Sequence, residues 1–234
     1  LNMETKPVID IRQQCSGFVY ALSIADQFIK TGMYRKALVV GSEIQSTWID
    51  KSTAGRNVAV IFGDGAGAVV VEATDDPESR VLSTHLHADG RYAEDLYIKD
   101  PGASRPVRAA TKEMVDEGGF NVFMNGNAVF KHAVVRFEEV IREALDANGL
   151  TEHDIHLLIP HQANIRISEY IRQKLGLPEE KVMNNIQKYG NTTAASIPIA
   201  LSEAWEQGRV NKGDLLCFAA FGSGFTWASA LVKW

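Results

Sequence analysis

Short apolar runs alternate with stretches of helical periodicity along this chain, and that alternation is typical of an α/β protein. Glycine-rich turns bound several of the runs. The runs that predict strands are Val8–Ile11, Ala37–Val40, Val58–Phe62, Ala66–Val71, Val81–Leu86, Ile155–Ile159, Asp214–Phe221 and Phe225–Val232. The predicted helices are 18–29, which Gly32 ends, 129–145, which Asn148-Gly149 ends, about 163–175, and about 192–207.

Residues Ala88 to Ala110 show no clear period and are rich in glycine, proline and charge. We expect a long functional loop here, because Tyr92, Leu96, Tyr97 and Ile98 give the segment apolar side chains to bury. The turn Gly63-Asp64-Gly65 is expected to join two strands.

The two parts of the chain repeat one arrangement. Val8–Ile11 leads through Cys15 into a helix, and Ile155–Ile159 leads through His161 into a helix. A polar linker with Pro77 separates the parts, so the predicted units are 1–79, with the nucleophile, and 80–234, with His161 and Asn191. A duplicated α/β unit explains the repeat, and it places reactive residues at the carboxyl ends of central strands, where such sheets bind ligands.

The repeat is incomplete at its start. The second unit has a strand and a long helix before its strand–His161–helix segment, whereas few residues precede Val8. The expected fold is therefore two related halves of which the first lacks an opening segment of about two strands and two helices.

The composition fits a soluble globular protein with a sizeable core, at 234 residues, 45% hydrophobic and 23% charged. No apolar run approaches the ~20 residues of a membrane helix, and no secretion signal opens the sequence. Cys217 lies in an apolar run and is expected to be a buried free thiol, so two reduced cysteines predict a cytoplasmic protein. The net charge of −5 and the absence of a basic stripe argue against nucleic-acid binding.

Cys15 is the candidate nucleophile, since it stands at the start of a long apolar helix. The partial positive charge of a helix N-terminus stabilises a thiolate, so we expect a lowered thiol pKa. A buried structural cysteine is the commoner alternative for a cysteine considered alone.

His161 and Asn191 supply an imidazole and a carboxamide. His161 follows an apolar strand and Pro160, and without a second ligand at usable spacing it is not expected to bind a metal. Asn191 lies in Gly190-Asn191-Thr192-Thr193, where it either caps a helix or donates its amide N–H to a developing enolate oxygen.

Two glycine-rich segments have different interpretations. Gly222-Ser223-Gly224 either places a backbone N–H against an oxyanion or forms an ordinary hairpin. Gly63-Asp64-Gly65-Ala66-Gly67 lacks the Lys-Ser/Thr of a phosphate-binding loop and leads into a strand, which excludes a nucleotide site. A thiol, an imidazole, a carboxamide and an oxyanion site together suit acyl-thioester chemistry.

These motifs make the chain resemble the β-ketoacyl-acyl-carrier-protein synthase III family, which initiates bacterial fatty-acid synthesis. The resemblance covers essentially all 234 residues. Its motifs are Cys15-Ser16-Gly17-Phe18, Gly63-Asp64-Gly65-Ala66, Gly126-Asn127, His161-Gln162-Ala163-Asn164, Gly190-Asn191-Thr192 and Gly222-Ser223-Gly224-Phe225.

The resemblance implies a thiolase-like α/β fold and a cytoplasmic, homodimeric acyltransferase. It implies a Cys15–His161–Asn191 triad, with the backbone N–H groups of Cys15 and Ser223 as oxyanion donors. No cofactor or metal is implied, because the acyl-coenzyme A thioester is a substrate, and no nucleic acid or membrane is an implied partner. The other implied contacts are Asn127, Asn164 and Phe221 for the substrate and Lys131 and Arg166 for the acyl carrier protein.

The implied reaction is a decarboxylative Claisen condensation of an acyl-coenzyme A primer with malonyl-acyl carrier protein. The His-Gly-Thr-Gly-Thr pattern of elongating ketosynthases and the second cysteine of thiolases are missing from the corresponding loops. A polyketide-priming ketosynthase or acyltransferase of the same family remains an alternative. A catalytically impaired fragment that acts only as a binding module is another.

Overall fold

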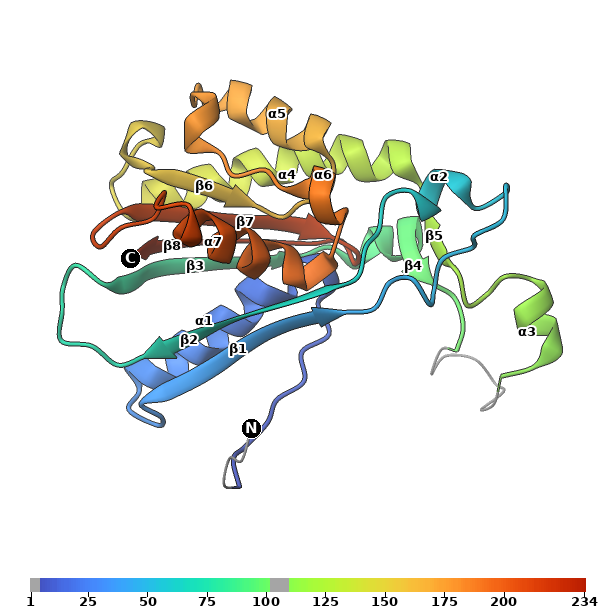
Figure 1. Cartoon of the computed structure of the whole chain (residues 1–234), viewed down its shortest axis with the longest axis horizontal. Coiled ribbons are helices and arrows are strands. Elements are labelled where there is room, and N and C mark those ends of the chain that lie inside the picture. Colours follow the sequence, from blue (N-terminus) through green and yellow to red (C-terminus); the bar gives the residue numbers. More distant parts are fainter. Residues whose placement is uncertain (1–4, 102–109) are drawn as a thin grey trace.

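A computed structural model describes residues 5–101 and 110–234, and its centre is a four-stranded sheet with the strand order β3-β8-β7-β6. The strands are β3 (Arg80–Ala88), β6 (Leu157–Pro160), β7 (Leu215–Gly222) and β8 (Thr226–Lys233). β8 pairs antiparallel with both β3 and β7, while β6 and β7 are parallel. This sheet lies between helices in Figure 1.

Side chains alternate along β7, so this one strand contributes to two cores. Leu216, Phe218 and Ala220 belong to the inner core, with α1 (Gly17–Lys30) and α7 (Ser196–Glu206). Cys217, Ala219 and Phe221 belong to the outer core, with α4 (Gly126–Ala147) and α5 (Ile165–Lys174). A period of two is what a strand buried on both faces requires. The predicted helical stripes and the predicted burial of Cys217 are thereby confirmed.

A second sheet contains β1 (Lys36–Glu43) and β2 (Gly65–Glu72), which pair antiparallel on the other side of α1 and α7 (Figure 1). Gly41 faces Gly67 across this pair. A Cβ at Gly41 would lie 2.6 Å from the carbonyl oxygen of Ala194, and one at Gly67 would lie 2.9 Å from the backbone nitrogen of Ile199. Gly41 and Gly67 therefore allow the start of α7 to lie directly on the backbones of β1 and β2. The glycines of Gly63–Gly67 thus allow close packing and do not form a ligand-binding loop.

The connecting elements are short. They are η1 (Gln14–Ser16), α2 (Arg56–Ala59), η2 (Gly90–Asp95), β4 (Leu96–Ile98), α3 (Lys112–Asp116), β5 (Val122–Met124), η3 (Glu152–Asp154), η4 (Glu179–Lys181), α6 (Ile186–Tyr189) and η5 (Thr193–Ala195). β4 and β5 pair antiparallel. Among residues 5–101 and 110–234, every helix is too short or too polar to span a membrane.

The predicted loop Ala88–Ala110 is more ordered than expected over the part that the structure describes. Its first half forms η2 and β4, and Leu96 is buried while Tyr92 stacks on Phe225 at 5.3 Å between ring centroids. Ile98 is exposed, contrary to the prediction that it is buried. Residues 102–109 of the predicted loop lie outside the described residues.

Two predicted strands are wrong. Val8–Ile11 has no strand partner among the described residues, and Val8 is 91% exposed. An apolar run becomes a strand only where a neighbouring strand satisfies its backbone. Val58–Phe62 instead begins inside the helical turn α2, in which the N–H groups of Val58 and Ala59 bond to the carbonyl of Gly55. Gly63-Asp64-Gly65 therefore does not join two paired strands, and β2 pairs with β1.

The outer face of the β1–β2 pair is apolar and exposed. Leu38 and Val70 face each other across the pair and are 52% and 66% exposed, and Val40 beside them is 53% exposed. Isolated exposed apolar residues are ordinary, but a contiguous group on a sheet promotes association. We call Leu38, Val40, Ala68 and Val70 the β1–β2 face.

Replacing Leu38 with lysine and Val70 with glutamate is expected to reduce self-association of the chain and its binding of a hydrophobic dye. The two new side chains are cross-strand neighbours of opposite charge, which is worth about 0.2–1 kcal/mol, so the fold is retained. Sedimentation velocity and dye fluorescence measure the change. Val115→Lys, at an exposed position on α3, is the matched control. Unchanged self-association of the double variant would show that the chain does not self-associate through the β1–β2 face.

Candidate active site

Cys15 lies in the short helix η1, which leads directly into α1 as the sequence predicted. The Ser16 hydroxyl donates to the carbonyl of Thr226 at 3.2 Å, so this turn is tied to the start of β8. Cys15 is 4% exposed. The nucleophile candidate is therefore fixed at one end of the central sheet and is nearly removed from solvent.

The end of β7 approaches the thiol closely. A Cβ at Gly222 would lie 2.3 Å from the Cβ of Cys15 and 2.6 Å from its Sγ, so only glycine fits without a shift. Backbone hydrogen bonds at Ser223 and at Cys15 both act to lower the pKa of the thiol. The two predicted oxyanion donors thus flank one sulfur atom.

The expected lowering of the Cys15 pKa is wrong for this structure. Burial first, and the Glu43 carboxylate second, raise the pKa of Cys15 to about 12, although the backbone hydrogen bonds act to lower it. Desolvation of a fully buried anion exceeds the partial charge at a helix N-terminus. Burial also raises the pKa of Cys217 to about 12, so both thiols are protonated near neutral pH.

His161 follows Pro160 at the carboxyl end of β6, as predicted. Its backbone N–H donates to the carbonyl of Ala219 at 2.8 Å, which extends the pairing of β6 with β7. Burial lowers the pKa of His161 to about 3, so the imidazole is neutral at physiological pH. Its Nδ1 lies 2.6 Å from Oγ of Ser196. Its Nε2 is buried and has no hydrogen-bond partner within the described parts of the chain.

Asn191 is buried between two segments. Its N–H donates to the carbonyl of Ile61 at 2.8 Å, and its carbonyl accepts from the N–H of Gly63 at 3.0 Å. Its Oδ1 accepts the N–H of Thr193 at 2.9 Å. The oxygen of the carboxamide therefore caps the local turn, and the donor atoms are on Nδ2. Capping the turn uses Oδ1 of Asn191, and donation to an enolate would use Nδ2, so the two interpretations are compatible.

The three candidate residues gather at one end of the sheet. A Cβ at Gly17, two residues after Cys15, would lie 3.3 Å from the Cβ of Ala194, three residues after Asn191. Ser196, on the same segment, contacts His161. No hydrogen bond joins Cys15 to His161 or to Asn191 within residues 5–101 and 110–234. The three segments therefore pack together, but the side chains of Cys15, His161 and Asn191 share no direct hydrogen bond among the described residues.

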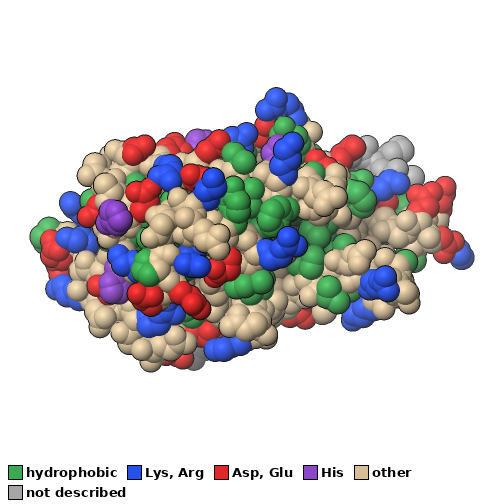
Figure 2. Space-filling model, turned by 90° about the horizontal axis from the view of Figure 1, so that it is seen from above, with side chains coloured by type: hydrophobic (Ala, Val, Ile, Leu, Met, Phe, Trp, Pro, Cys, Tyr) green, Lys and Arg blue, Asp and Glu red, His purple; other side chains and the backbone are tan. Residues whose placement is uncertain are grey.

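The other predicted contacts divide into two groups. Asn127, Lys131, Asn164 and Arg166 are exposed near the N-terminal ends of α4 and α5, and the Arg166 guanidinium lies 5.6 Å from the Phe130 ring. Phe221 is instead buried in the outer core, with its ring 4.9 Å from that of Phe225. Figure 2 shows basic and acidic side chains mixed over the face seen from above, with hydrophobic side chains toward its middle.

Sequence reasoning missed the groups that hold the site in place. The buried Gln162 side chain donates to the carbonyls of Pro160 and Met183 and accepts the N–H groups of Asn185 and Ile186. It therefore joins the His161 loop to the segment that leads to Asn191. Its sequence signal was its place in the motif His161-Gln162-Ala163-Asn164, which does not reveal these contacts.

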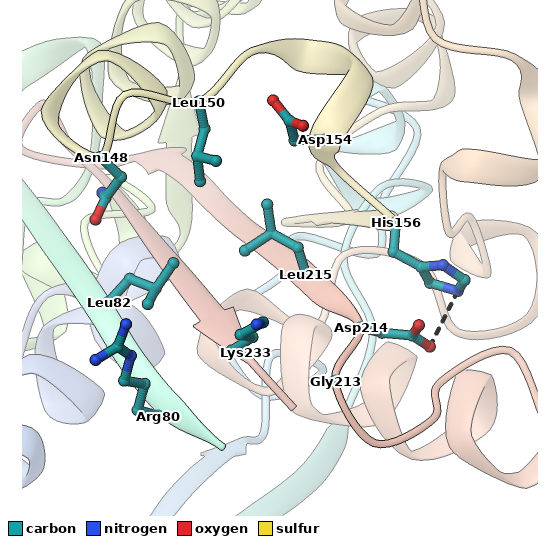
Figure 3. Close-up of a pocket in the computed structure, with 10 residues that line it drawn as sticks. All are labelled: Arg80, Leu82, Asn148, Leu150, Asp154, His156, Gly213, Asp214, Leu215 and Lys233. Atoms are coloured by element: carbon teal, nitrogen blue, oxygen red, sulfur yellow. Dashed lines mark ion pairs between the residues drawn. The ribbon is translucent and has the colours of Figure 1, made fainter. Parts of the chain in front are cut away.

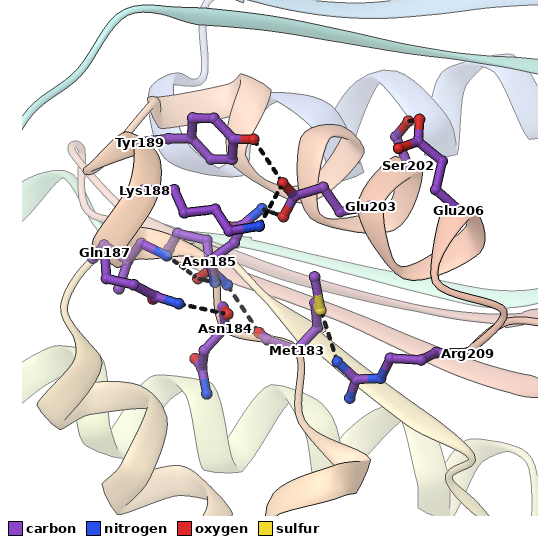
Figure 4. Close-up of polar contacts among 12 residues, drawn as sticks. Met183, Asn184, Asn185, Gln187, Lys188, Tyr189, Ser202, Glu203, Glu206 and Arg209 are labelled. Atoms are coloured by element: carbon purple, nitrogen blue, oxygen red, sulfur yellow. Dashed lines mark hydrogen bonds and ion pairs between the residues drawn. The ribbon is translucent and has the colours of Figure 1, made fainter.

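Glu203 holds the same segment from the other side (Figure 4). Its carboxylate accepts hydrogen bonds from Asn185 at 3.0 Å, from Lys188 at 3.0 Å and from the Tyr189 hydroxyl at 2.6 Å. Tyr189 is two residues before Asn191, so α7 fixes the approach to the carboxamide. Nothing in the periodicity of α7 distinguishes Glu203 from an ordinary surface residue.

A cavity of about 540 Å³ lies at the opposite end of the sheet, away from these residues (Figure 3). Its lining includes Arg80, Leu215 and Lys233, which begin β3, begin β7 and end β8. His156 and Asp214 form an ion pair on its wall at 3.2 Å. Within the described residues, no three His, Cys, Asp or Glu side chains gather as metal ligands.

Comparison with known proteins identifies the family of this chain. Residues 9–90 match the family model of 3-oxoacyl-[acyl-carrier-protein] synthase III, and residues 145–234 match the model of its C-terminal part. A β-ketoacyl-[acyl-carrier-protein] synthase III from Alkalilimnicola ehrlichii is 47% identical over 226 residues, which cover 96% of this chain and 67% of that protein. The chain belongs to the 3-oxoacyl-[acyl-carrier-protein] synthase III family.

Solved structures of this family confirm the thiolase-like α/β fold. The synthase III of Aquifex aeolicus VF5 superposes with a TM-score of 0.84 at 44% identity, over 94% of this chain and 65% of that one. A priming β-ketosynthase of the R1128 polyketide pathway gives a TM-score of 0.79 at 33% identity, over 94% and 63%. The chain thus spans about two thirds of the length of these family members. The boundary between residues 79 and 80 stays a prediction.

Replacing Glu43 with glutamine is expected to speed alkylation of Cys15 at a fixed pH below 10. The change removes the carboxylate that raises the Cys15 pKa and keeps a side chain of the same shape. Labelling with iodoacetamide, followed by peptide mass spectrometry, measures the rate, which rises about tenfold per pH unit while the thiol is mostly protonated. Cys217 in the same chain is the internal control. Equal acceleration at Cys217 would indicate loosening of the fold.

Replacing Gly222 with alanine is expected to destabilise the chain by about 1–3 kcal/mol, the usual cost of overpacking a core, and to displace Cys15. Denaturant unfolding gives the stability, and the labelling rate of Cys15 reports the displacement. Gly90→Ala is the matched control, because a Cβ there meets nothing within 4 Å. A Gly222→Ala chain with unchanged stability and unchanged labelling would contradict the close contact.

Proposed function

We propose that this chain catalyses the decarboxylative Claisen condensation of an acyl-coenzyme A primer with malonyl-acyl carrier protein, the reaction that initiates fatty-acid synthesis. One observation carries the proposal. A thiol, a neutral imidazole and a carboxamide are buried at the same end of the sheet, and backbone donors at Ser223 and Cys15 flank the sulfur. Family membership supports the same assignment.

In the first half-reaction, the Cys15 sulfur attacks the thioester carbonyl of the primer. The thiol proton passes to the unpartnered Nε2 of His161 and then to the departing coenzyme A thiolate. Because burial raises the pKa of the Cys15 thiol, we propose that its proton leaves as the sulfur attacks the carbonyl. The backbone N–H groups of Cys15 and Ser223 stabilise the tetrahedral oxyanion, and removal of one such donor costs about 2.7–4 kcal/mol.

In the second half-reaction, the malonyl thioester loses carbon dioxide and leaves an enolate. His161 and Asn191 donate hydrogen bonds to the enolate oxygen, and the enolate carbon attacks the acyl-Cys15 carbonyl. The bond between that carbonyl and Sγ breaks, and the β-ketoacyl chain stays on the carrier. Cys15 leaves as a thiolate and takes up one proton from solvent to return to the thiol. Loss of carbon dioxide drives the step, so these residues need no metal or redox cofactor for it.

The exposed residues indicate the partners. Asn127 and Asn164 are proposed to contact the pantetheine arm. Phe221, which is buried, is proposed to contact the substrate from within the core. Lys131 and Arg166 are proposed to attract the acidic carrier protein, because a local pair of cations steers an anionic partner despite the net charge of −5. We further propose a homodimer in the cytoplasm, where both cysteines stay reduced.

A polyketide-priming function is the second candidate. The structural match to the priming β-ketosynthase of the R1128 polyketide pathway supports it, at lower identity than the matches to the synthases III. Product analysis with malonyl-acyl carrier protein and a series of acyl-coenzyme A primers distinguishes the two pathways.

The Cys15→Ala chain is expected to form no acyl-enzyme with acetyl-coenzyme A, because it has lost the nucleophile. His161→Ala and Asn191→Ala are expected to lose malonyl decarboxylation by at least about a hundredfold, as for other oxyanion donors, while Asn191→Ala still becomes acylated. Intact mass after incubation measures acylation, and release of labelled carbon dioxide measures decarboxylation.

Cys217→Ala is the control, since Cys217 lies in the outer core. An acetyl adduct on Cys15→Ala would exclude Cys15 as the nucleophile. Folded wild-type chain that gains no acetyl group would indicate that these 234 residues act as a binding module.

A further inference from the structure

Ser196, the first residue of α7, contacts His161 but belongs to none of the motifs that carry the family resemblance. The residue is 2% exposed. Its Oγ lies 2.6 Å from Nδ1 of His161 and 2.9 Å from the carbonyl oxygen of Thr193, and it accepts the backbone N–H of Gln162 at 3.3 Å. Three groups therefore converge on one buried hydroxyl.

The hydrogen-bond roles at this hydroxyl follow from its capacity. A hydroxyl donates one hydrogen bond and accepts two. The Thr193 carbonyl only accepts, and the Ser196 hydroxyl proton lies within reach of it at 2.9 Å. With the proton in that direction, the lone pairs of Oγ face the N–H of Gln162 and Nδ1 of His161, and Nδ1 then carries the ring proton.

We propose that Ser196 is a positioning residue that holds the proton of neutral His161 on Nδ1 and so presents a bare Nε2 to Cys15. This inference rests on the proposed function. The buried Nε2 has no other partner within the described residues, so its lone pair is available for the thiol proton. Ser196 thus acts through His161 in the first half-reaction.

The choice of a hydroxyl has a consequence for the second half-reaction. An enolate needs a donor, which is the opposite tautomer of His161, with the proton on Nε2. A carboxylate at position 196 would only accept and would lock the proton on Nδ1. The Ser196 hydroxyl can rotate away from Thr193 and donate to Nδ1, and the Thr193 carbonyl keeps the backbone N–H of Ser196 as its partner. One side chain therefore supports both tautomers.

The first test needs no activity. Nitrogen-15 NMR of imidazole-labelled chain is expected to show, for His161, a protonated Nδ1 and an unprotonated Nε2 near neutral pH. His161→Gln identifies the signals. In Ser196→Ala, Nδ1 loses its nearest acceptor, and the population with the proton on Nε2 is expected to increase. A proton on Nε2 in the wild-type chain, or the same tautomer in both chains, would overturn the proposal.

The second test separates the half-reactions. Ser196→Ala is expected to slow acylation of Cys15 by acetyl-coenzyme A at least about tenfold, as for loss of an oriented general base, and to slow malonyl decarboxylation much less. Ser196→Thr keeps the hydroxyl and is expected to restore acylation. Ser202→Ala, an exposed serine on the same helix, is the control and is expected to match the wild type. Equal loss of both half-reactions in Ser196→Ala would contradict the proposal.

The two tests distinguish this proposal from the proposed function. Thermal unfolding shows whether Ser196→Ala is folded, and the wild-type tautomer is readable even if the variant is not. A wild-type chain with the expected tautomer but no acylation would sink the proposed function and leave the role of Ser196 in setting the tautomer intact.

Discussion

The contact between the end of β7 and the start of α1 is the constraint on which the site depends. Gly222 lies directly against Cys15, and no side chain fits between them. This contact sets the distance between the two backbones, and through β7 it also sets the position of β6 and His161. The same approach brings the Ser223 backbone to the sulfur. A sheet end and a helix start are thereby joined into one rigid site.

Rigidity at the sheet end is extended by buried polar side chains. Gln162 and Ser196 each satisfy several backbone or ring groups, and neither reaches solvent. A fully satisfied buried network specifies one arrangement, because any shift leaves a polar group without a partner. Glu203 does the same from the surface for the segment before Asn191. The reactive residues are few, and most of the neighbouring polar groups hold them in place.

Sequence pattern predicted those parts of the fold in which burial alone decides the structure. β7 and β8 are apolar on both faces, and α4 carries a clear stripe, so these elements followed from the sequence. Val8–Ile11 and Val58–Phe62 are equally apolar but do not form strands, because a strand depends on a partner that no local pattern reveals. The residues of the candidate triad were chosen from their motifs, and the structure places all three at one end of the sheet while their roles stay predictions. The Cys15 pKa was not, since burial in three dimensions outweighs the local helix terminus.

The burial of His161 away from solvent also makes the stability of the fold depend on pH. The His161 pKa is about 3 in the folded chain and 6.5 in an ordinary histidine. Between pH 6.5 and 3, His161 is therefore protonated in the unfolded chain but not in the folded chain, and this difference favours unfolding. The stability that this residue contributes is complete above pH 6.5 and declines as the pH falls toward 3. The desolvation that keeps the His161 imidazole uncharged therefore makes the fold acid-labile. A chain that solvated His161 would tolerate acid better, but its imidazole would be partly cationic where the thiol needs a base.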